Sequence, residues 1–371
     1  KIFIYSKTKL KLMKRRSFNK VFTTSLTGFS VSPTIISSFK PAKKLGVALV
    51  GLGSYSTRAL GPALLKTKHC DLKAIVTGTP SKEKVWQKEY DLDENNIYNY
   101  QNFESISNND EIDIVYIVLP NSMHKEYTIK ALEAGKHVIC EKPLALNANE
   151  ARDMIKVSKK VKKELFVGYR LHYEPHHLQL IKICKNEEFG KLKIINAAFG
   201  FNMRSTGHWK LKKSYGGGAL MDVGVYAIQA ARYTSNEEPI SISAKEYKTD
   251  FKRFNEVDET IVWEMVFPSG KVANCTTSFS SNLNYLHLAF ERGFAKLNPA
   301  YGWGRVSGKM SRGELNFPQI NQQAAQMDGI SDYLNNKIPH NNVGGDEGLK
   351  DMIIIDKIIE SLKKNGERIF I

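Results

Sequence analysis

The stretch KKLGVALVGLGSYSTRALGPALLKT, residues 43–67, sets the architecture of the N-terminal half of the chain. Val47–Val50 form a continuous apolar run, which predicts a buried strand, and a glycine-rich turn leads from it into a helical pattern. Gly51, Gly53 and Ser56 give the spacing G-x-G-x-x-S. Glycine backbone can approach a phosphate closely and a helix N-terminus attracts anions, so this turn predicts a pyrophosphate site. An ordinary tight turn between strand and helix is the alternative.

Strands and helices alternate from this turn to about residue 170. Such alternation predicts a parallel sheet covered by helices on both faces, which is the Rossmann arrangement when the first turn carries this glycine spacing. Further strands are expected within 70–79, 112–120, 136–143 and 164–170, and helices within 80–90, 124–135 and 147–163.

The pattern changes after residue 170, where several segments show period-two alternation and PSG at 268–270 signals a hairpin turn. We therefore predict an α/β Rossmann domain over residues 45–168. Over 169–371 we predict an α+β domain with a large, mostly antiparallel open sheet. Its strands are expected within 192–201, 240–248, 259–280 and 286–304, and its helices within 175–190, 321–336 and 346–366.

Residues 1–44 hold eleven Lys and Arg residues and no Asp or Glu, so the rest of the chain carries only +5 of the +16 net charge. No basic stripe with interleaved aromatics follows, which argues against a nucleic-acid partner. Arg15 and Arg16 of MKRRSFNK (13–20) precede a modestly apolar stretch, the plan of a twin-arginine export signal. This predicts that the twin-arginine machinery exports the folded protein to the periplasm. A disordered basic arm is the alternative, and residues 1–12 precede the first Met.

The four cysteines, Cys70, Cys140, Cys184 and Cys275, are widely spaced, with no C-x-x-C pair and no Cys/His cluster. This spacing indicates neither a zinc site nor a small disulfide framework. We expect buried thiols and a protein without a metal ion.

The end of the second expected strand bears on the choice of nicotinamide cofactor. An Asp or Glu there would bind the ribose 2′-hydroxyl and repel a 2′-phosphate. The chain has Thr77, Ser81 and Lys82 in this region, and no acid before Glu83. Hydroxyls and an ammonium suit a phosphate, so we predict NADP in preference to NAD. A solvated loop lysine is the alternative for Lys82.

Two further motifs carry candidate catalytic groups. CEKPLA (140–145) places Lys142 directly after an apolar strand, at the carboxyl edge where open α/β sheets bind ligands. GGGALMDVGVY (216–226) places Asp222 four residues before Tyr226, on one helix face if the stretch is helical. A solvated lysine and a core aromatic are the alternatives for the first and last of these side chains.

Taken together, these segments resemble the Gfo/Idh/MocA oxidoreductase family, and the resemblance covers essentially the whole chain after the leader. Most members have His where Tyr226 stands, and Tyr there is similar to the glucose-fructose oxidoreductases within the family. The segment FNMRSTGHWK (201–210) departs from the pattern of that group. The motifs that carry the resemblance are the glycine turn, LPNSMH (119–124), EKP (141–143), GYRLHYEP (168–175), WKLKKSYGGG (209–218) and RYTSNEEP (232–239).

The resemblance implies that the Rossmann domain closes against an open sheet, with the three glycines lying across the nicotinamide and a sugar. It implies that Tyr226 takes the proton from a sugar hydroxyl as hydride leaves for the nicotinamide. A free phenol is a poor base at neutral pH, so Lys142 would stabilise the phenolate and polarise the substrate oxygen. Asp222 would hold the sugar hydroxyl and orient Lys142 or Tyr226.

The resemblance also implies two sets of binding residues beside the catalytic Lys142, Asp222 and Tyr226. The residues expected at the substrate are Lys142, Tyr169, His208, Trp209, Asp222 and Tyr226. The residues expected at the cofactor are Gly51, Gly53, Ser54, Tyr55, Thr77, Ser81, Lys82, Leu119, Pro120, Asn121, His124, Glu141, Lys142 and Arg170.

The activity implied is oxidation of an aldose at C1 by a bound NADP that a second carbonyl compound, such as a ketose, reoxidises. Export favours a retained cofactor, because the periplasm is not expected to hold a free NADP pool. Three alternatives remain: an NAD-dependent glycosidase of the same fold, a polyol or dihydrodiol dehydrogenase using free NAD(P), and a non-catalytic sugar-binding protein. The open sheet predicts a homo-oligomer, a dimer or a tetramer.

Overall fold

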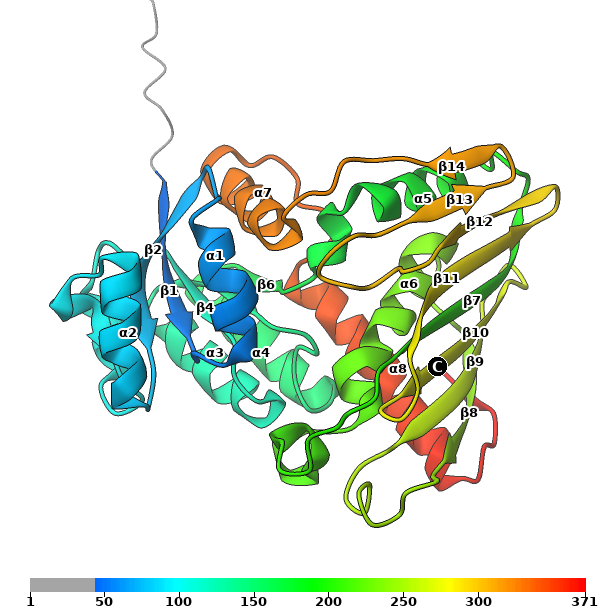
Figure 1. The fold of residues 1–371 in the computed structure, drawn as a ribbon, viewed down its shortest axis with the longest axis horizontal. Helices are drawn as coiled ribbons and strands as arrows, with labels where there is room; N and C mark the ends of the chain where they lie inside the picture. The colour runs from blue at the N-terminus through cyan, green and yellow to red at the C-terminus, as the bar shows by residue number, and fades with distance from the viewer. Residues whose placement is uncertain (1–43) are drawn as a thin grey trace, which may run out of the picture. The chain divides into compact units, whose positions relative to one another are not determined.

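A parallel sheet of six strands forms the N-terminal part of the fold in the computed structural model, which describes residues 44–371 (Figure 1). The strand order is β3-β2-β1-β4-β5-β6, and every neighbouring pair is parallel. This order confirms the predicted Rossmann arrangement. The strands are β1 (Leu45–Val50), β2 (Cys70–Val76), β3 (Ile97–Tyr98), β4 (Ile114–Ile117), β5 (His137–Cys140) and β6 (Leu165–Val167).

Helices follow the strands much as the sequence pattern predicts. The first begins as a π-helical turn, Ser56–Leu60, and continues as α1 (Gly61–Leu64), while α2 spans Pro80–Tyr90. Asn147 caps the N-terminus of α4 (Ala148–Val161), because its side chain accepts a hydrogen bond from the Glu150 backbone. The remaining helices are α3 (His124–Glu133), α5 (Pro175–Lys185), α6 (Val225–Ser235), α7 (Gln322–Asn336) and α8 (Gly345–Lys363).

A second sheet of nine strands dominates the C-terminal half, in the order β14-β13-β12-β11-β7-β10-β9-β8-β15. Neighbours are antiparallel except β7 and β10, which run parallel, so the sheet is mostly antiparallel as predicted. Its strands are β7 (Leu192–Gly200), β8 (Ser241–Tyr247), β9 (Thr260–Val266), β10 (Val272–Ser278), β11 (Leu283–Phe290), β12 (Gly293–Leu297), β13 (Gly308–Met310), β14 (Gly313–Leu315) and β15 (Ile369–Phe370).

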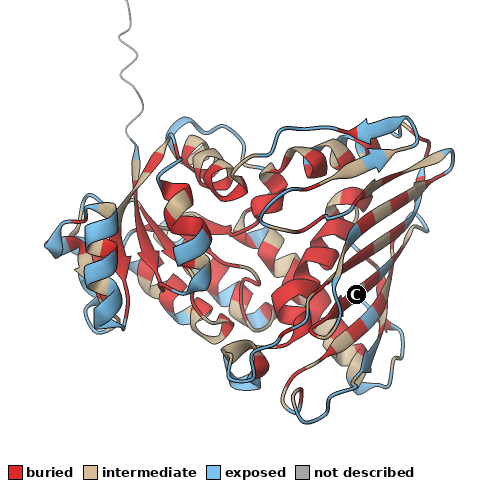
Figure 2. Ribbon diagram, in the orientation of Figure 1, coloured by how far each residue is buried: buried red, intermediate tan, exposed pale blue. Residues whose placement is uncertain are grey.

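The alternation along these strands separates a buried face from an open one. In β9, Ile261, Trp263 and Met265 are buried, whereas Val262 between them is exposed. The buried face packs on α6 and α8, which lie between the two sheets (Figure 1). Figure 2 shows buried residues filling the sheets and the helices between them, while α2 is exposed along most of its length.

The carboxyl edge of the parallel sheet gathers most of the motifs found in the sequence. Gly51 follows β1, Leu119 and Pro120 lie just beyond β4, and Glu141 and Lys142 follow β5. Leu119 and Glu141 are buried, and Pro120 and Lys142 are half-buried. Because carboxyl ends of parallel strands meet at one edge, groups distant in sequence face the same space.

Several sequence-based expectations concern the termini, thiols and metals. The predicted export signal lies in residues 1–43, outside the described residues. Within residues 44–371 no helix has the length and apolarity needed to cross a membrane. The cysteines are free thiols, three of them buried and Cys184 half-buried. Among the same residues, no cluster of three or more His, Cys, Asp or Glu side chains is arranged to hold a metal ion.

Candidate active site

Lys142, Asp222 and Tyr226 lie together although 80 residues separate the lysine from the carboxylate. The Lys142 Nζ donates to the Asp222 backbone carbonyl at 2.6 Å and lies 3.6 Å from its Oδ1. The same Nζ is 4.8 Å from the centre of the Tyr226 ring. Burial alone would lower the pKa of this ammonium, but the Tyr226 oxygen and the Asp222 carboxylate raise it above its ordinary value.

A π-helical turn presents the carboxylate and the phenol. Leu220–Gly224 form this turn, and α6 continues from Val225. Both Asp222 and Tyr226 are buried, at 8% and 9% exposure. The Tyr226 ring packs edge-on against the Phe199 ring of β7, with 5.4 Å between the ring centres. The ring is therefore held by the sheet domain while Lys142 of the Rossmann domain lies over it.

Lys210 is part of this cluster and was not predicted. Its Nζ lies 2.7 Å from Asp222 Oδ2, so two ammonium groups flank one carboxylate. Burial would raise the pKa of Asp222, but Lys210 and Lys142 lower it below its ordinary value. The predicted substrate residues His208 and Trp209 precede it, half-buried, and His208 Nδ1 accepts from the Lys210 backbone at 3.2 Å.

Arg170 contacts the phenol directly. Its Nη2 donates to the Tyr226 hydroxyl at 3.3 Å, and its guanidinium carbon lies 5.2 Å from the ring centre. The remaining contacts are to the backbone carbonyls of Tyr301 and Gly302 and to the Gln322 side chain. Arg170 is only 1% exposed. Arg170, which was expected at the cofactor, thus lies beside the candidate catalytic residue Tyr226.

Glu141, which was expected at the cofactor, is buried and bonded to protein groups. Its Oε1 accepts from the Tyr116 hydroxyl at 2.8 Å, and its Oε2 accepts from the Lys142 backbone at 3.3 Å. Gln326 of α7 donates to the same Tyr116 hydroxyl at 3.4 Å. Burial raises the pKa of Glu141 above its ordinary value despite the nearby Lys142. This carboxyl group therefore supports the backbone that carries Lys142.

The three glycines of GGGALMDVGVY, which the resemblance places across the nicotinamide and the sugar, pack closely against protein atoms. A Cβ at Gly216 would meet Leu146 and Asn121, and one at Gly218 would meet the Asp258 carboxylate. The Asn121 side chain, expected at the cofactor, donates to the Gly216 carbonyl at 2.7 Å. These contacts show that protein packing requires the glycines, because neighbouring protein atoms occupy the space a side chain would need.

The turn after β1 has the geometry that a dinucleotide needs. Gly51 has φ of +88°, and a Cβ there would meet the Val118 carbonyl. The Ser56 hydroxyl donates to the Gly51 carbonyl at 2.5 Å and so ties the helix to the turn. Gly53 and Ser54 are exposed, and a Cβ at Gly53 would meet nothing within 4 Å. Open space above glycine backbone fits a pyrophosphate.

The residues expected at the adenosine end of the cofactor differ in how exposed they are. Ser81 and Lys82 are exposed at the start of α2, and the Lys82 Nζ donates to the Leu52 carbonyl of the glycine turn at 2.8 Å. Thr77 is buried, and its hydroxyl accepts from the Thr79 backbone at 3.2 Å. Ser81 and Lys82 thus remain accessible to a 2′-phosphate, whereas the Thr77 hydroxyl faces its own loop.

Two predicted ligand residues have structural contacts instead. His124 is fully buried, and its ring nitrogens lie 2.8 Å and 3.0 Å from the carbonyls of Pro143 and Leu119, so it joins two motifs. Tyr169 is also buried, and its hydroxyl donates to Asp351 at 2.6 Å. Sequence gives the residue types, whereas the tertiary fold decides their partners.

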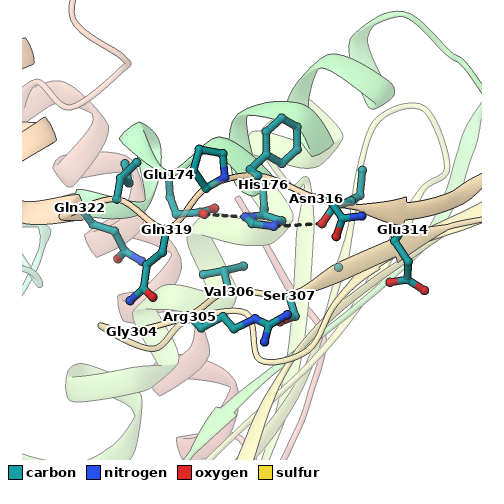
Figure 3. A pocket seen from close by; sticks show the side chains of 15 residues that line it. Glu174, His176, Gly304, Arg305, Val306, Ser307, Glu314, Asn316, Gln319 and Gln322 are labelled. Atoms are coloured by element: carbon teal, nitrogen blue, oxygen red, sulfur yellow. Dashed lines mark hydrogen bonds and ion pairs between the residues drawn. The ribbon is translucent and has the colours of Figure 1, made fainter.

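A cavity of about 470 Å³ lies next to the catalytic cluster without including it. It is lined by the start of α5, by the β13–β14 hairpin and by the connections on either side (Figure 3). His176 lies in its wall between Glu174 and the Leu315 carbonyl. Gln322 lines the same cavity and also contacts Arg170. Lys142, Asp222 and Tyr226 do not line it.

Lys210→Ala is expected to lower kcat/KM about 10- to 100-fold, because a freed Asp222 carboxylate no longer holds Lys142 in place. Lys210 lowers the pKa of Asp222, so its loss raises that pKa, and activity should fail at a higher pH on acidification. The matched control is Lys212→Ala on the same segment, since Lys212 pairs with the peripheral Glu256. Steady-state kinetics across pH test this. Equal effects of the two variants would contradict a role for Lys210.

Comparison with known proteins agrees with this geometry. Residues 45–169 match the oxidoreductase family with an NAD-binding Rossmann fold, Gfo/Idh/MocA, and residues 177–294 match the GFO/IDH/MocA C-terminal domain. The chain therefore belongs to the Gfo/Idh/MocA oxidoreductase family.

Individual relatives share much of the chain's length. The crystal structure of aldose-aldose oxidoreductase from Caulobacter crescentus, complexed with glycerol, is 34% identical with a TM-score of 0.85, covering 89% of this chain and 100% of that one. D-xylose 1-dehydrogenase [NADP(+)] of Haloarcula marismortui is 24% identical over 85% of this chain and 90% of its own. Trans-1,2-dihydrobenzene-1,2-diol dehydrogenase of Danio rerio is 29% identical over 59% of this chain and 64% of its own.

Proposed function

We propose that the protein oxidises an aldose at C1 with a tightly bound NADP, which a second carbonyl compound such as a ketose then reoxidises. The observation that carries the proposal is the Tyr226 phenol, which contacts the Arg170 guanidinium and lies near the Lys142 ammonium, the latter at the carboxyl edge of the parallel sheet. The names of the Caulobacter and Haloarcula relatives support a sugar substrate.

Side chains of this protein would transfer one proton and stabilise one developing charge. Tyr226 takes the C1 hydroxyl proton of the aldose, and the Arg170 Nη2 donates to the phenol oxygen that carries the charge. Lys142 polarises the substrate oxygen as it becomes a carbonyl, while Asp222 holds the lysine in place. When bound, the nicotinamide supplies hydride acceptance at C4. The first half-reaction gives a lactone, the reduced cofactor and one proton.

The second half-reaction returns the enzyme to its starting state. Tyr226 would return the proton to the oxygen of the second substrate, whose carbonyl carbon would accept the hydride that a reduced nicotinamide supplies. One aldose is oxidised and one carbonyl compound is reduced, so no external nicotinamide is consumed. Because the lactone leaves before the second substrate takes the hydride, the kinetics would be ping-pong.

NADP is the cofactor we favour. Ser81 and Lys82 are exposed beside the glycine turn, and no acidic side chain follows β2 before Glu83. The NADP(+) in the name of the Haloarcula relative supports the same choice. A retained cofactor also suits periplasmic location after twin-arginine export, which we propose from the leader motif in residues 1–43.

Two further proposals concern partners and a rival activity. The outer face of the nine-stranded sheet exposes apolar side chains, among them Ile194, Val262 and Tyr285, which supports self-association as a dimer or tetramer. The dihydrodiol dehydrogenases among the relatives favour one rival, a dehydrogenase that uses free NAD(P). Retention of the nucleotide separates the two activities.

The test is to purify the protein without added nucleotide, denature it and identify any released nucleotide by mass spectrometry. The proposal predicts about one NADP(H) for each chain, surviving dialysis of the native protein. Lys82→Glu should lower the retained NADP(H) at least tenfold, because a carboxylate beside the 2′-phosphate repels it. Lys84→Glu, two residues along the same exposed helix, is the control. Absence of nucleotide from the wild-type protein would favour the rival dehydrogenase.

A further inference from the structure

We propose that the segment Tyr301–Gly304 is a latch that retains the nucleotide on the glycine turn, with Trp303 as the closing residue. This inference rests on the proposed function, because it explains how a cofactor would be retained through many turnovers. It concerns a connection that follows β12 in the second domain and reaches the first turn of the Rossmann domain.

One end of the latch is fixed by Arg170. The Arg170 Nη2 donates to the Tyr301 carbonyl at 2.5 Å, and its Nη1 donates to the Gly302 carbonyl at 3.1 Å. Gln322 Nε2 also donates to the Gly302 carbonyl, at 3.4 Å. Charge-assisted bonds to two successive carbonyls hold the backbone as far as Gly302, the residue before Trp303.

The other end lies on the glycine turn. The Trp303 ring is 5.0 Å from the Tyr55 ring, with an angle of 43° between the ring planes. Tyr55 is the residue after Ser54 in the turn, and its hydroxyl accepts from Gln323 at 3.4 Å. An indole that follows the second domain's β12 thus contacts the aromatic ring that follows Gly53 and Ser54 in the glycine turn.

The exposure of Trp303 needs a reason beyond packing. The side chain is 49% exposed, although a large aromatic ring gains most when it is buried. A nucleotide lying along the turn would cover part of the ring that solvent now contacts. The contact with Tyr55 and the contact with a ligand would then act together to slow its departure.

Trp303 has a glycine on either side, Gly302 and Gly304, which suits a segment that opens and closes. Neither Gly302 nor Gly304 has a positive φ, and a Cβ at Gly304 would meet nothing within 4 Å. Neither the present backbone conformation nor space requires glycine at 304, so glycine serves the freedom to adopt another conformation. Gly304 and the next residue, Arg305, line the neighbouring cavity (Figure 3).

The latch is also tied to the chemistry. The guanidinium that holds the Tyr301 and Gly302 carbonyls donates to the Tyr226 hydroxyl at 3.3 Å. Arg170 therefore connects the phenol that handles the proton to the segment that covers the cofactor. Arg170 thus contacts both Tyr226 and the backbone that precedes Trp303.

The experiment measures the release of NADPH from the loaded full-length protein. Bound NADPH is chased with excess NADP⁺, and the loss of its fluorescence is followed for wild type, Trp303→Ala, Trp303→Phe and Phe317→Ala. Phe317 is a matched control, because it is 38% exposed on the connection before α7 and its ring contacts His176, not Tyr55. Melting temperatures of the nucleotide-free proteins check that each variant is folded.

The latch predicts that Trp303→Ala releases NADPH about tenfold faster than wild type, with Trp303→Phe between them and Phe317→Ala unchanged. Release from Trp303→Ala at the wild-type rate, with wild type retaining its nucleotide, would overturn the latch and leave the proposed function standing. Equal acceleration in Phe317→Ala would also overturn it. Rapid release from wild type itself would contradict the retained cofactor and the latch together.

Discussion

Tyr226→Phe is expected to lower kcat for aldose oxidation by a factor of about 10² to 10⁴, the usual contribution of a positioned acid–base group. The substitution removes one oxygen, while the ring that packs on Phe199 and lies under Lys142 remains. Nucleotide content and melting temperature should therefore stay close to those of wild type. Rapid mixing of the loaded protein with an aldose, followed at the absorbance band of the reduced nicotinamide, measures the loss.

The control for this variant is Tyr233→Phe on the same helix. The Tyr233 hydroxyl bonds to His177 at 2.5 Å and takes no part in the cluster around Lys142. The Tyr233→Phe protein should retain activity within a few-fold of wild type. A Tyr226→Phe protein that reduces its nicotinamide at the wild-type rate would show that the phenol is a packing residue and that another group accepts the proton.

Lys142→Ala is expected to lower kcat by a factor of about 10² to 10³, the cost of losing one charged donor at a developing oxyanion. The pKa of the Lys142 ammonium lies above the ordinary lysine value, so this group stays charged through the neutral range. Its loss therefore removes a full charge at pH 7. Added methylammonium should restore part of the activity, because a small cation fits the vacated space. Saturable rescue, measured from initial rates, distinguishes lost chemistry from lost folding.

Lys125→Ala serves as the comparison, since Lys125 pairs with Asp153 on the exposed side of α3. This variant should keep its activity and gain nothing from methylammonium. If Lys142→Ala had wild-type kcat, the ammonium would have no role in the chemical step. Rescue of both variants alike would indicate a general salt effect.

Much of the fold could be predicted because it is written in local patterns. The helix expected at 80–90 is α2 with the same limits, and the helix expected within 147–163 is α4, capped by Asn147. The apolar run 112–120 contains β4, and period-two alternation identified β9 and β10 on either side of the hairpin turn. The short strands β13, β14 and β15 were not predicted, because two or three residues are too few for periodicity.

The candidate site was predictable only in part. Lys142, Asp222 and Tyr226 were named from a strand end, a helical pattern and the family resemblance together, and the structure brings the three side by side. Lys210 was missed, because no periodicity marks it and only the fold brings it to Asp222. The contact of Arg170 with the phenol likewise depends on a connection more than 130 residues away. Partner choice across such separations is a tertiary property, which one sequence does not encode locally.

The most direct test of the central claim follows one deuterium atom. The protein, carrying only its own nucleotide, is mixed with an aldose deuterated at C1 and with a ketose acceptor, and the polyol product is analysed by mass spectrometry. The account predicts that the polyol carries deuterium at its new C–H bond, with no nucleotide added. A polyol without deuterium, or no polyol until free NADP is supplied, would contradict it.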